Sequence, residues 1–189
     1  CLQKKENLLE LLRLMYLAHM LIGCCEAVCK VGLFTVVKKV EEGKVWLRLI
    51  MDQRRGNRIW KRPPFCPLGG ASSLAWCDFS GIEKEGMELR VSMGDIPNYY
   101  YHLLLPESFA PYFVLPGVTV QELKEFMKSK GEECLLEGTF ISIRVLAMGW
   151  SWAVFLAQVC LQDRVTGASS HLREDNKLLE GGVIPRNQP

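Results

Sequence analysis

A carboxylate followed by aromatic residues is the part of this sequence best suited to chemistry. Asp95 follows a predicted strand at residues 88–93 and precedes three consecutive tyrosines at 99–101. A carboxylate at the end of a strand is a hard oxygen ligand of the kind that Mg²⁺ prefers. Aromatic rings give a base or a sugar a surface on which to stack. The alternative is that Asp95 is a polar residue in a surface turn.

The charge distribution favours a functional role for Asp95 over a place in a surface turn. The whole chain has a net charge of +2, but residues 38–62 carry nine basic and three acidic side chains, so this segment has +6 and the remainder −4. The basic residues are Lys38, Lys39, Lys44, Arg48, Arg54, Arg55, Arg58, Lys61 and Arg62. A basic segment together with aromatic rings and a carboxylate indicates a site that binds phosphate groups, because nucleic-acid affinity depends mainly on such charges.

Three motifs resemble those of reverse transcriptases. Residues 47–57 read Leu-Arg-Leu-Ile-Met-Asp-Gln-Arg-Arg-Gly-Asn, which is similar to the fingers signature of Leu-Arg, three hydrophobic residues and Asp-x-Arg-x-x-Asn. Residues 92–106 resemble motif A, with Asp95, an aromatic residue five positions on and Pro106. Residues 148–158 resemble motif B, in which a glycine is followed nine positions later by a glutamine. The motifs occur in the family's order, and the resemblance covers about residues 31–158.

The resemblance implies a two-metal mechanism of nucleotide transfer. Asp95 would be the catalytic carboxylate and a ligand of two Mg²⁺ ions, and Ile96 would offer its backbone carbonyl to one of them. Because two such ions need several carboxylates, Asp95 alone does not complete the site. The family's motif C, with its paired aspartates, has no match after Gln158. We therefore expect this chain to be inactive alone.

The resemblance also assigns the substrate-binding residues. The phosphates of the incoming nucleotide would contact Arg48, helped by Lys38 or Lys39, and Arg suits this task because its guanidinium presents a fork of donors. Tyr100 would pack against the sugar and exclude a 2′-hydroxyl. The motif B element would support the nascent base pair and the template through Gly149 and Gln158.

The implied architecture is an α+β, reverse-transcriptase-like fingers and partial palm with an incomplete palm sheet. We expect one partial domain over residues 1–189, with fingers at about 1–70 and 107–147 and palm at about 88–106 and 148–189. The parent activity would be RNA-directed DNA polymerisation in a retroelement such as a retrotransposon. Its partners would be an RNA or DNA template-primer and deoxynucleotide triphosphates.

Two alternatives stay open. One is that the chain is a degenerate remnant that binds nucleic acid without catalysis, and the other is that it is an unrelated nucleic-acid-binding module. Some positions depart from the family pattern: no proline follows Gly149, Met148 stands where many members have Gln or Phe, and Pro97 interrupts motif A. These departures leave the template and nucleotide preferences open. Structural roles are the simpler interpretation for Asp52 and Arg54, which we expect to pair.

Local patterns predict the elements that position these residues. We expect one or two helices over 6–29, a hairpin of strands at 31–40 and 45–51, and a loop from 63 to 71 followed by a short helix. Strands or extended segments are expected at 88–93, 99–105 and 139–147. A helix is expected over 118–130, where Thr119 and Glu122 have the spacing of a capping box. A buried helix is expected over 151–161, and Trp150 and Trp152 are expected in the core.

Composition limits the class of protein. The apolar stretch at residues 8–29 contains Glu10, Arg13, His19 and Glu26, so it predicts no membrane span. None of the eight cysteines forms a C-x2-C pair of the kind found in zinc sites. We expect reduced, mostly buried thiols in an intracellular protein, cytoplasmic or nuclear and not secreted, with Cys24, Cys25 and Cys29 on a helix.

Overall fold

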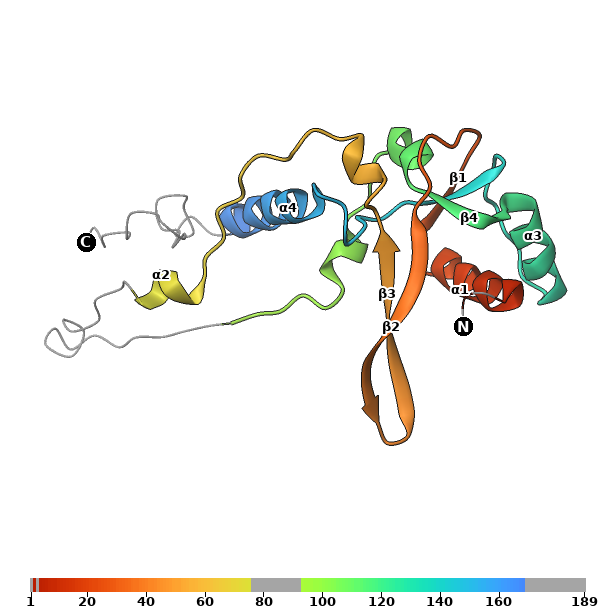
Figure 1. The fold of residues 1–189 in the computed structure, drawn as a ribbon, viewed down its shortest axis with the longest axis horizontal. Helices are drawn as coiled ribbons and strands as arrows, with labels where there is room; N and C mark the ends of the chain where they lie inside the picture. Colours follow the sequence, from red (N-terminus) through yellow and green to blue (C-terminus); the bar gives the residue numbers. More distant parts are fainter. Residues whose placement is uncertain (1, 3, 76–92, 169–189) are drawn as a thin grey trace, which may run out of the picture. The chain divides into compact units, whose positions relative to one another are not determined.

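The computed structural model describes residues 2, 4–75 and 93–168, which divide into two compact units. The first is drawn from Cys1–Pro63 and Asn98–Ala153, and the second from Pro64–Pro97 and Val154–Pro189. The first unit combines helices with two antiparallel sheets, which confirms the α+β class (Figure 1). The strand predicted at 88–93 lies almost entirely outside the described residues.

Helix α1 (Lys5–Leu17) is shorter than the helical pattern of the sequence predicted. The chain leaves the helix at His19, which has a φ of 56°. The amide of His19 donates to the carbonyl of Tyr16, and the amide of Met20 donates to that of Met15. These are the two bonds of a Schellman motif, which ends a helix by satisfying its last carbonyls.

A three-stranded antiparallel sheet follows, in the order β1 (Leu21–Cys24), β5 (Phe140–Ile143), β4 (Val114–Thr119). The helix expected at Cys24, Cys25 and Cys29 was therefore wrong, because residues 21–24 pair with 140–143 instead. The structure describes six cysteines, and all six are free of disulfide bonds. Only Cys29 and Cys134 among them are buried, so the expectation of mostly buried thiols also fails.

The second sheet is the predicted hairpin of β2 (Gly32–Glu41) and β3 (Lys44–Asp52), and the structure confirms it. Glu42 and Gly43 in the turn have φ angles of 50° and 74°, as a type I′ turn requires. The distal half extends away from the rest of the first unit (Figure 1). Its apolar side chains are consequently exposed: Val37, Val40, Val45, Trp46 and Leu47.

Backbone pairing attaches the base of the hairpin to the larger sheet. The amide of Val31 donates to the carbonyl of Val114 at 2.8 Å, and the amide of Val114 donates to the carbonyl of Cys29 at 3.2 Å. Val31 and Val114 are fully buried, together with Phe113, Ile141 and Ile143. The hairpin therefore begins from the centre of the core.

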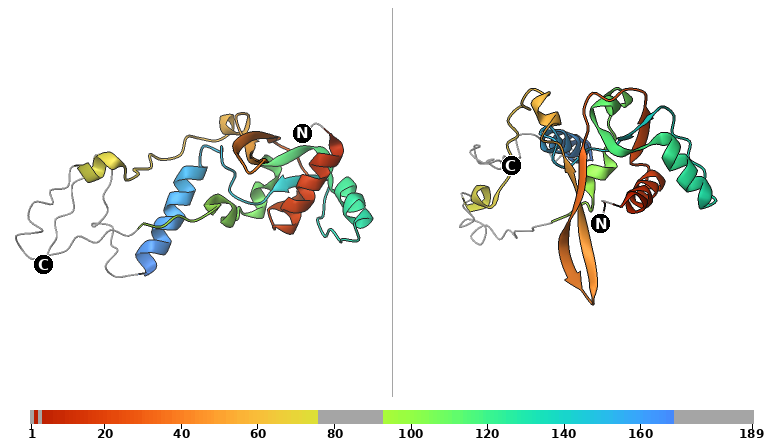
Figure 2. Two further views of the ribbon diagram at one scale, coloured as in Figure 1. Left: turned by 90° about the horizontal axis from the view of Figure 1, so that it is seen from below. Right: turned by 45° about the vertical axis from the view of Figure 1, so that its right-hand side comes forward.

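Helix α3 (Val120–Ser129) begins at the predicted capping box. The amide of Glu122 donates to Oγ1 of Thr119 at 3.3 Å, and the amide of Thr119 donates to Oε2 of Glu122 at 2.8 Å. Lys5 of α1 also donates to Glu122, and this bond, with those from Thr119, lowers the pKa of Glu122 to about 2. A second ion pair, Arg13 with Glu132 at 2.6 Å, joins α1 to the segment after α3. Figure 2 shows the two helices side by side.

The structure corrects two further expectations in the first unit. Tyr99–His102 forms a 3-10 helix rather than an extended segment, because Asn98 adopts a left-handed φ of 57° and its carbonyl accepts from the amide of Tyr101. Another 3-10 helix spans Glu107–Tyr112. The strand expected at 139–147 is assigned only over β5, but its pairing continues, since the amide of Leu146 donates to the carbonyl of Leu103 at 2.8 Å.

The second unit contains the predicted short helix α2 (Ala71–Ala75) and, from Val154 on, the predicted helix α4 (Ala153–Ala168). The expectation that the helix over 151–161 is buried fails for Val154 and Val159, which are exposed. Across the part of the chain that the structure describes, no helix has both the length and the apolar character that a bilayer crossing requires.

The cap of α3 gives a test of the first unit's stability. Thr119→Ala should lower the free energy of unfolding by about 1 kcal/mol, because it leaves the first-turn amide of Glu122 without its side-chain acceptor. Thr139→Ala is the matched control, since the Thr139 side chain is exposed and lies outside a helix cap. Urea unfolding followed by circular dichroism measures both. Equal losses in the two variants would contradict the role given to the cap.

Candidate functional site

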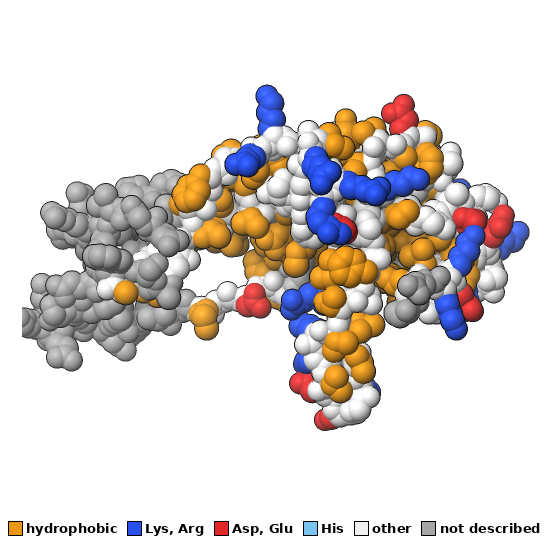
Figure 3. Space-filling model, viewed as in Figure 1, with side chains coloured by type: hydrophobic (Ala, Val, Ile, Leu, Met, Phe, Trp, Pro, Cys, Tyr) orange, Lys and Arg blue, Asp and Glu red, His pale blue; other side chains and the backbone are white. Residues whose placement is uncertain are grey.

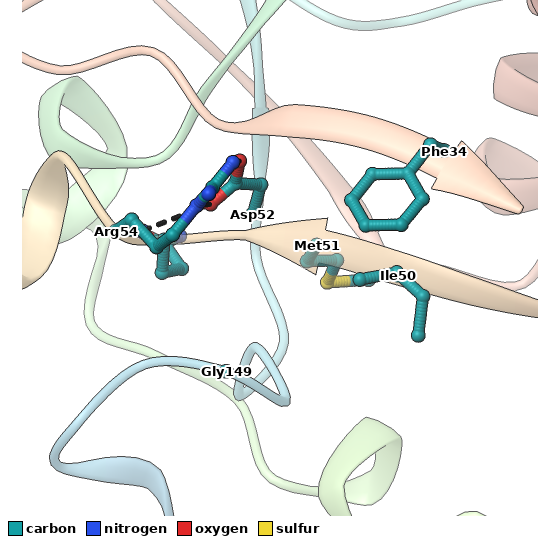
Figure 4. A pocket seen from close by; sticks show the side chains of 7 residues that line it. Phe34, Ile50, Met51, Asp52, Arg54 and Gly149 are labelled. Atoms are coloured by element: carbon teal, nitrogen blue, oxygen red, sulfur yellow. Dashed lines mark hydrogen bonds and ion pairs between the residues drawn. The ribbon is translucent and has the colours of Figure 1, made fainter.

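The end of β3 and the loop that carries Gly149 enclose a pocket of about 330 Å³, which we call the β3 pocket. Its walls are formed by Phe34, Ile50, Met51, Asp52, Gln53, Arg54 and Gly149. In Figure 4, Phe34 and Ile50 project from neighbouring strands, and Gly149 faces the end of β3. The pocket thus has an apolar side made by the hairpin and a polar rim made by the Asp52–Arg54 pair.

Gly149 approaches the hairpin more closely than any other residue type could. Its φ is 112°, and a Cβ atom placed on it would lie 2.8 Å from the carbonyl oxygen of Met51. A side chain there would meet backbone, which cannot yield as a flexible side chain does. Glycine is therefore required both by the backbone conformation and by the contact with β3.

Asn57 fastens the Gly149 loop to the chain that follows β3. Its Nδ2 donates to the carbonyl of Gly149 at 3.0 Å, and its Oδ1 accepts from the amide of Ser151 at 2.8 Å. Asn57 lies just beyond β3, in a 3-10 helix, η1 (Gly56–Arg58). One amide side chain thus joins the two motifs, which lie more than 90 residues apart in the sequence.

Aromatic packing also joins the Gly149 loop to the segment that follows β3. Trp150 is 4% exposed, which confirms its place in the core, and its ring meets those of Trp60 at 5.4 Å and Phe113 at 5.2 Å. Trp152 is only half-buried, and its Nε1 donates to the carbonyl of Lys61 at 2.7 Å. The segment after β3 is therefore held to the Gly149 loop by both rings and hydrogen bonds.

Gln53, which lines the β3 pocket, has a buried side-chain amide. Its side chain is 2% exposed, and neither its Nε2 nor its Oε1 has a hydrogen-bond partner among the described residues. A buried polar group without a partner costs about 1–3 kcal/mol. The Oε1 of Gln53 lies against Gly56, where an added Cβ would be only 2.5 Å away, so the amide is packed inside the fold.

Arg54 and Asp52 form the pair that the sequence predicted. Nε of Arg54 donates to Oδ1 of Asp52 at 2.9 Å and Nη2 donates to Oδ2 at 2.6 Å. These bonds, with one from the backbone amide of Arg54, lower the pKa of Asp52 to about 2. Asp52 is therefore a fixed negative charge at neutral pH and orients Arg54 at the rim.

The predicted phosphate-binding residues lie on the hairpin and differ in how far their charges are compensated. Arg48 pairs with Val36 across the hairpin, and Lys38 occupies an irregularity in the pairing between Val37 and Lys39. Lys39 forms an ion pair with Glu41 at 2.8 Å and lies over the ring of Trp46. Lys38 and Arg48 are exposed and form no ion pair within the described residues.

The remaining predicted site residues fall in both units. Tyr100 is half-buried in the first unit, where its ring meets that of Tyr99 at 6.4 Å. Asp95 and Ile96 are exposed in the second unit, in an irregular segment, and Gln158 is half-buried in α4 of that unit. That Asp95, Ile96 and Gln158 lie close to the hairpin residues stays a prediction.

No group of three His, Cys, Asp or Glu side chains suited to a metal occurs among the described residues. The described carboxylates therefore do not fit a site for two metal ions by themselves.

Comparison with known proteins adds no family assignment. No protein-family model matches the chain, and no curated protein is significantly similar to it. The geometry of the first unit is therefore the main support for a functional proposal.

Sequence reasoning missed the two amide side chains at this site. Asn57 is the last residue of the fingers signature, but the motif alone does not say that its partner is the Gly149 loop. Gln53 occupies a variable position of the signature, between Asp52 and Arg54, and strand alternation was the only signal that it faces inward. Neither role could be derived without the contact between segments distant in sequence.

The close contact at Gly149 can be separated from its backbone conformation by a matched pair of variants. Gly131 has a φ of 76° and open space where a Cβ would lie, so Gly131→Ala introduces only backbone strain, which costs about 1–2 kcal/mol. Gly149→Ala adds a clash with Met51 and should lower the free energy of unfolding by at least about 1 kcal/mol more. Urea unfolding of both variants checks this. If Gly149→Ala lowered the free energy of unfolding by no more than Gly131→Ala does, the Gly149 loop would not be in close contact with β3.

Proposed function

We propose that this chain is the fingers and part of the palm of a reverse transcriptase, whose parent activity is RNA-directed DNA polymerisation by a retroelement. One observation carries the proposal. The fingers signature and the glycine of motif B, recognised separately in the sequence, supply the walls of one 330 Å³ pocket. Two motifs that contact the same base pair are expected to lie together in this way.

The shape and polarity of the β3 pocket suit a nucleobase. Phe34 and Ile50 offer apolar surface for the faces of a ring, and the Asp52–Arg54 pair offers polar groups at the rim. Arg48 lies two residues from Ile50, so strand alternation puts both side chains on the same face of the hairpin. If the base of a nucleotide lay in the pocket, the cation of Arg48 would therefore lie on the same face of the hairpin and could bind its phosphate.

The catalytic part of the proposal depends on Asp95 and on carboxylates beyond the described residues. Mg²⁺ ions would neutralise charge on the reacting phosphates when bound. The residues of this chain would contribute a negatively charged ligand at Asp95 and a bulky ring at Tyr100. Positioning and positive charge are the main demands of phosphoryl transfer, and the hairpin offers both.

Salt-dependent binding of a template-primer duplex tests the role of the hairpin. Affinity should fall steeply as salt rises, and Arg48→Ala with Lys38→Ala should flatten that dependence by about 2 in the slope of log K against log salt. Arg48→Ala with Lys39→Ala is the matched control. It should flatten the slope less, because Glu41 already compensates Lys39. Fluorescence anisotropy at several salt concentrations measures the slopes. Salt-independent binding, or no binding, would overturn the proposal.

Primer extension on an RNA template tests the catalytic assignment. A polypeptide with these 189 residues followed by a palm hairpin with paired aspartates should incorporate deoxynucleotides in the presence of Mg²⁺. Asp95→Asn should abolish extension while duplex binding stays nearly unchanged, because it removes charge at almost constant shape. Tyr100→Ala should keep extension and admit ribonucleotides. Robust extension by Asp95→Asn would show that the carboxylate is wrongly assigned, and binding without any extension would favour a non-catalytic remnant.

A further inference from the structure

The outer half of the hairpin is a two-stranded sheet with an exposed apolar face. Val45 and Leu47 lie on this face, because they alternate with Trp46 along β3, and each shares it with its cross-strand partner, Val40 or Val37. These four side chains are 49–64% exposed. Figure 3 shows hydrophobic side chains gathered on the projecting hairpin. An isolated two-stranded sheet is marginally stable in water, so further strands would stabilise it.

The two edges of this sheet differ in how well they resist pairing with another strand. On β2, the pairing is irregular between Val37 and Lys39, and two lysines, Lys38 and Lys39, stand at the irregularity. Bulges and lysines are common protections of an edge strand. Residues 45–49 of β3 contain no extra residue in the pairing, no proline and one charge, at Arg48. The outer edge of these residues, which we call the β3 edge, is therefore open to another strand.

The turn determines which main-chain groups form the β3 edge. A two-residue turn makes Glu41 and Lys44 a hydrogen-bonded pair, so the main-chain groups of every second residue from Lys44 point toward β2. Pointing outward are the groups of the residues between them, Val45, Leu47 and Leu49. The carbonyl oxygen of Met51, next in this series, agrees, because it faces the Gly149 loop. No other segment of the described chain hydrogen-bonds to the outward groups of residues 45–49.

A second copy of β3, running antiparallel, would satisfy these groups. If a two-fold axis passes beside Leu47, this residue faces its own copy, and Val45 faces the partner's Leu49. The outward groups then meet in hydrogen-bonded pairs. The same patch serves both copies, as a two-fold interface requires. The result is a four-stranded sheet in which the apolar faces of the two hairpins are continuous.

Charge selects this register over its neighbours. Trp46 stands opposite the partner's Arg48, twice by symmetry, in the non-hydrogen-bonded pairs where side chains are closest. A guanidinium over an indole ring is favourable, and Lys39 already lies 5.4 Å from the centroid of the Trp46 ring. A shift of two residues in either direction would place Arg48 opposite the partner's Lys44 or the partner's Arg48. Like charges directly opposite each other destabilise a sheet.

We propose that the β3 edge is a homodimer interface, in which two copies of this chain pair antiparallel about Leu47 and Trp46 of each copy contacts the partner's Arg48. The inference does not rest on the proposed function. Because that function assigns Arg48 to a phosphate, the dimer concerns the chain free of nucleic acid. Association should be weak, since pairing along one edge buries less than the roughly 1,200 Å² of a standard interface.

Sedimentation velocity of the full 189-residue chain, at rising micromolar concentrations and without nucleic acid, tests the dimer. Leu47→Lys should weaken association by about tenfold or more, because it sets two ammonium groups opposite each other at the axis. Val37→Lys is the matched control. Val37 is the cross-strand partner of Leu47 on the same face, but its two copies would be about 14 Å apart, so association should change little. Circular dichroism verifies that both variants fold.

Cysteine cross-linking tests the register. Leu47→Cys should form an interchain disulfide on oxidation with copper phenanthroline, because the facing Cα atoms would be about 5.5 Å apart. Val45→Cys is the control, since the two copies of residue 45 would be separated by more than about 13 Å. Both variants contain the same native cysteines, so background cross-linking is equal. Non-reducing gel electrophoresis measures the dimer fraction.

The outcomes decide between this interface and other modes of association. A chain that stays monomeric at all concentrations overturns the inference. Equal weakening by Leu47→Lys and Val37→Lys also overturns it, because that result would mean packing through the apolar face. Cross-linking of Val45→Cys as efficient as that of Leu47→Cys contradicts the register. Weakening by Leu47→Lys alone, together with cross-linking at residue 47 alone, supports the inference.

Discussion

The backbone of Phe113 and Val114 is the constraint on which the first unit depends. On one side the amide and carbonyl of Val114 bond to Cys29 and Val31, and on the other the carbonyl of Phe113 accepts from Ile143 at 3.1 Å. Both side chains are fully buried. The base of the hairpin and the larger sheet are therefore parts of one hydrogen-bonded framework, which fixes the geometry of the β3 pocket at that base.

Elements with a strong local cause could be predicted from the sequence. The hairpin follows from β-forming residues on either side of Glu42 and Gly43, and α3 follows from the spacing of Thr119 and Glu122. The Asp52–Arg54 pair is local as well, because its partners lie two positions apart. In each case the interaction that stabilises the structure joins residues within a few positions of each other.

Features set by distant partners could not be predicted. Residues 21–24 read as helix but become β1 because β5, more than 100 residues later, supplies their hydrogen-bond partners. Asn98 takes a left-handed conformation that turns the tyrosine block into a 3-10 helix. The same limit applies to the site: the motifs indicated Gly149 and the residues around Asp52, but the role of Asn57 appears only when the chain is folded.

The hydrogen bonds between Asn57 and the Gly149 loop hold the loop in place without involving its side chains. Both of its hydrogen bonds are made to main-chain atoms, the carbonyl of Gly149 and the amide of Ser151. The side chains of Met148 and Ser151 are exposed and take no part in them. The attachment therefore depends on no side chain at 148 or 151 and excludes only proline at 151. This loop can vary its surface, and with it the ligands it contacts, without losing its place in the fold.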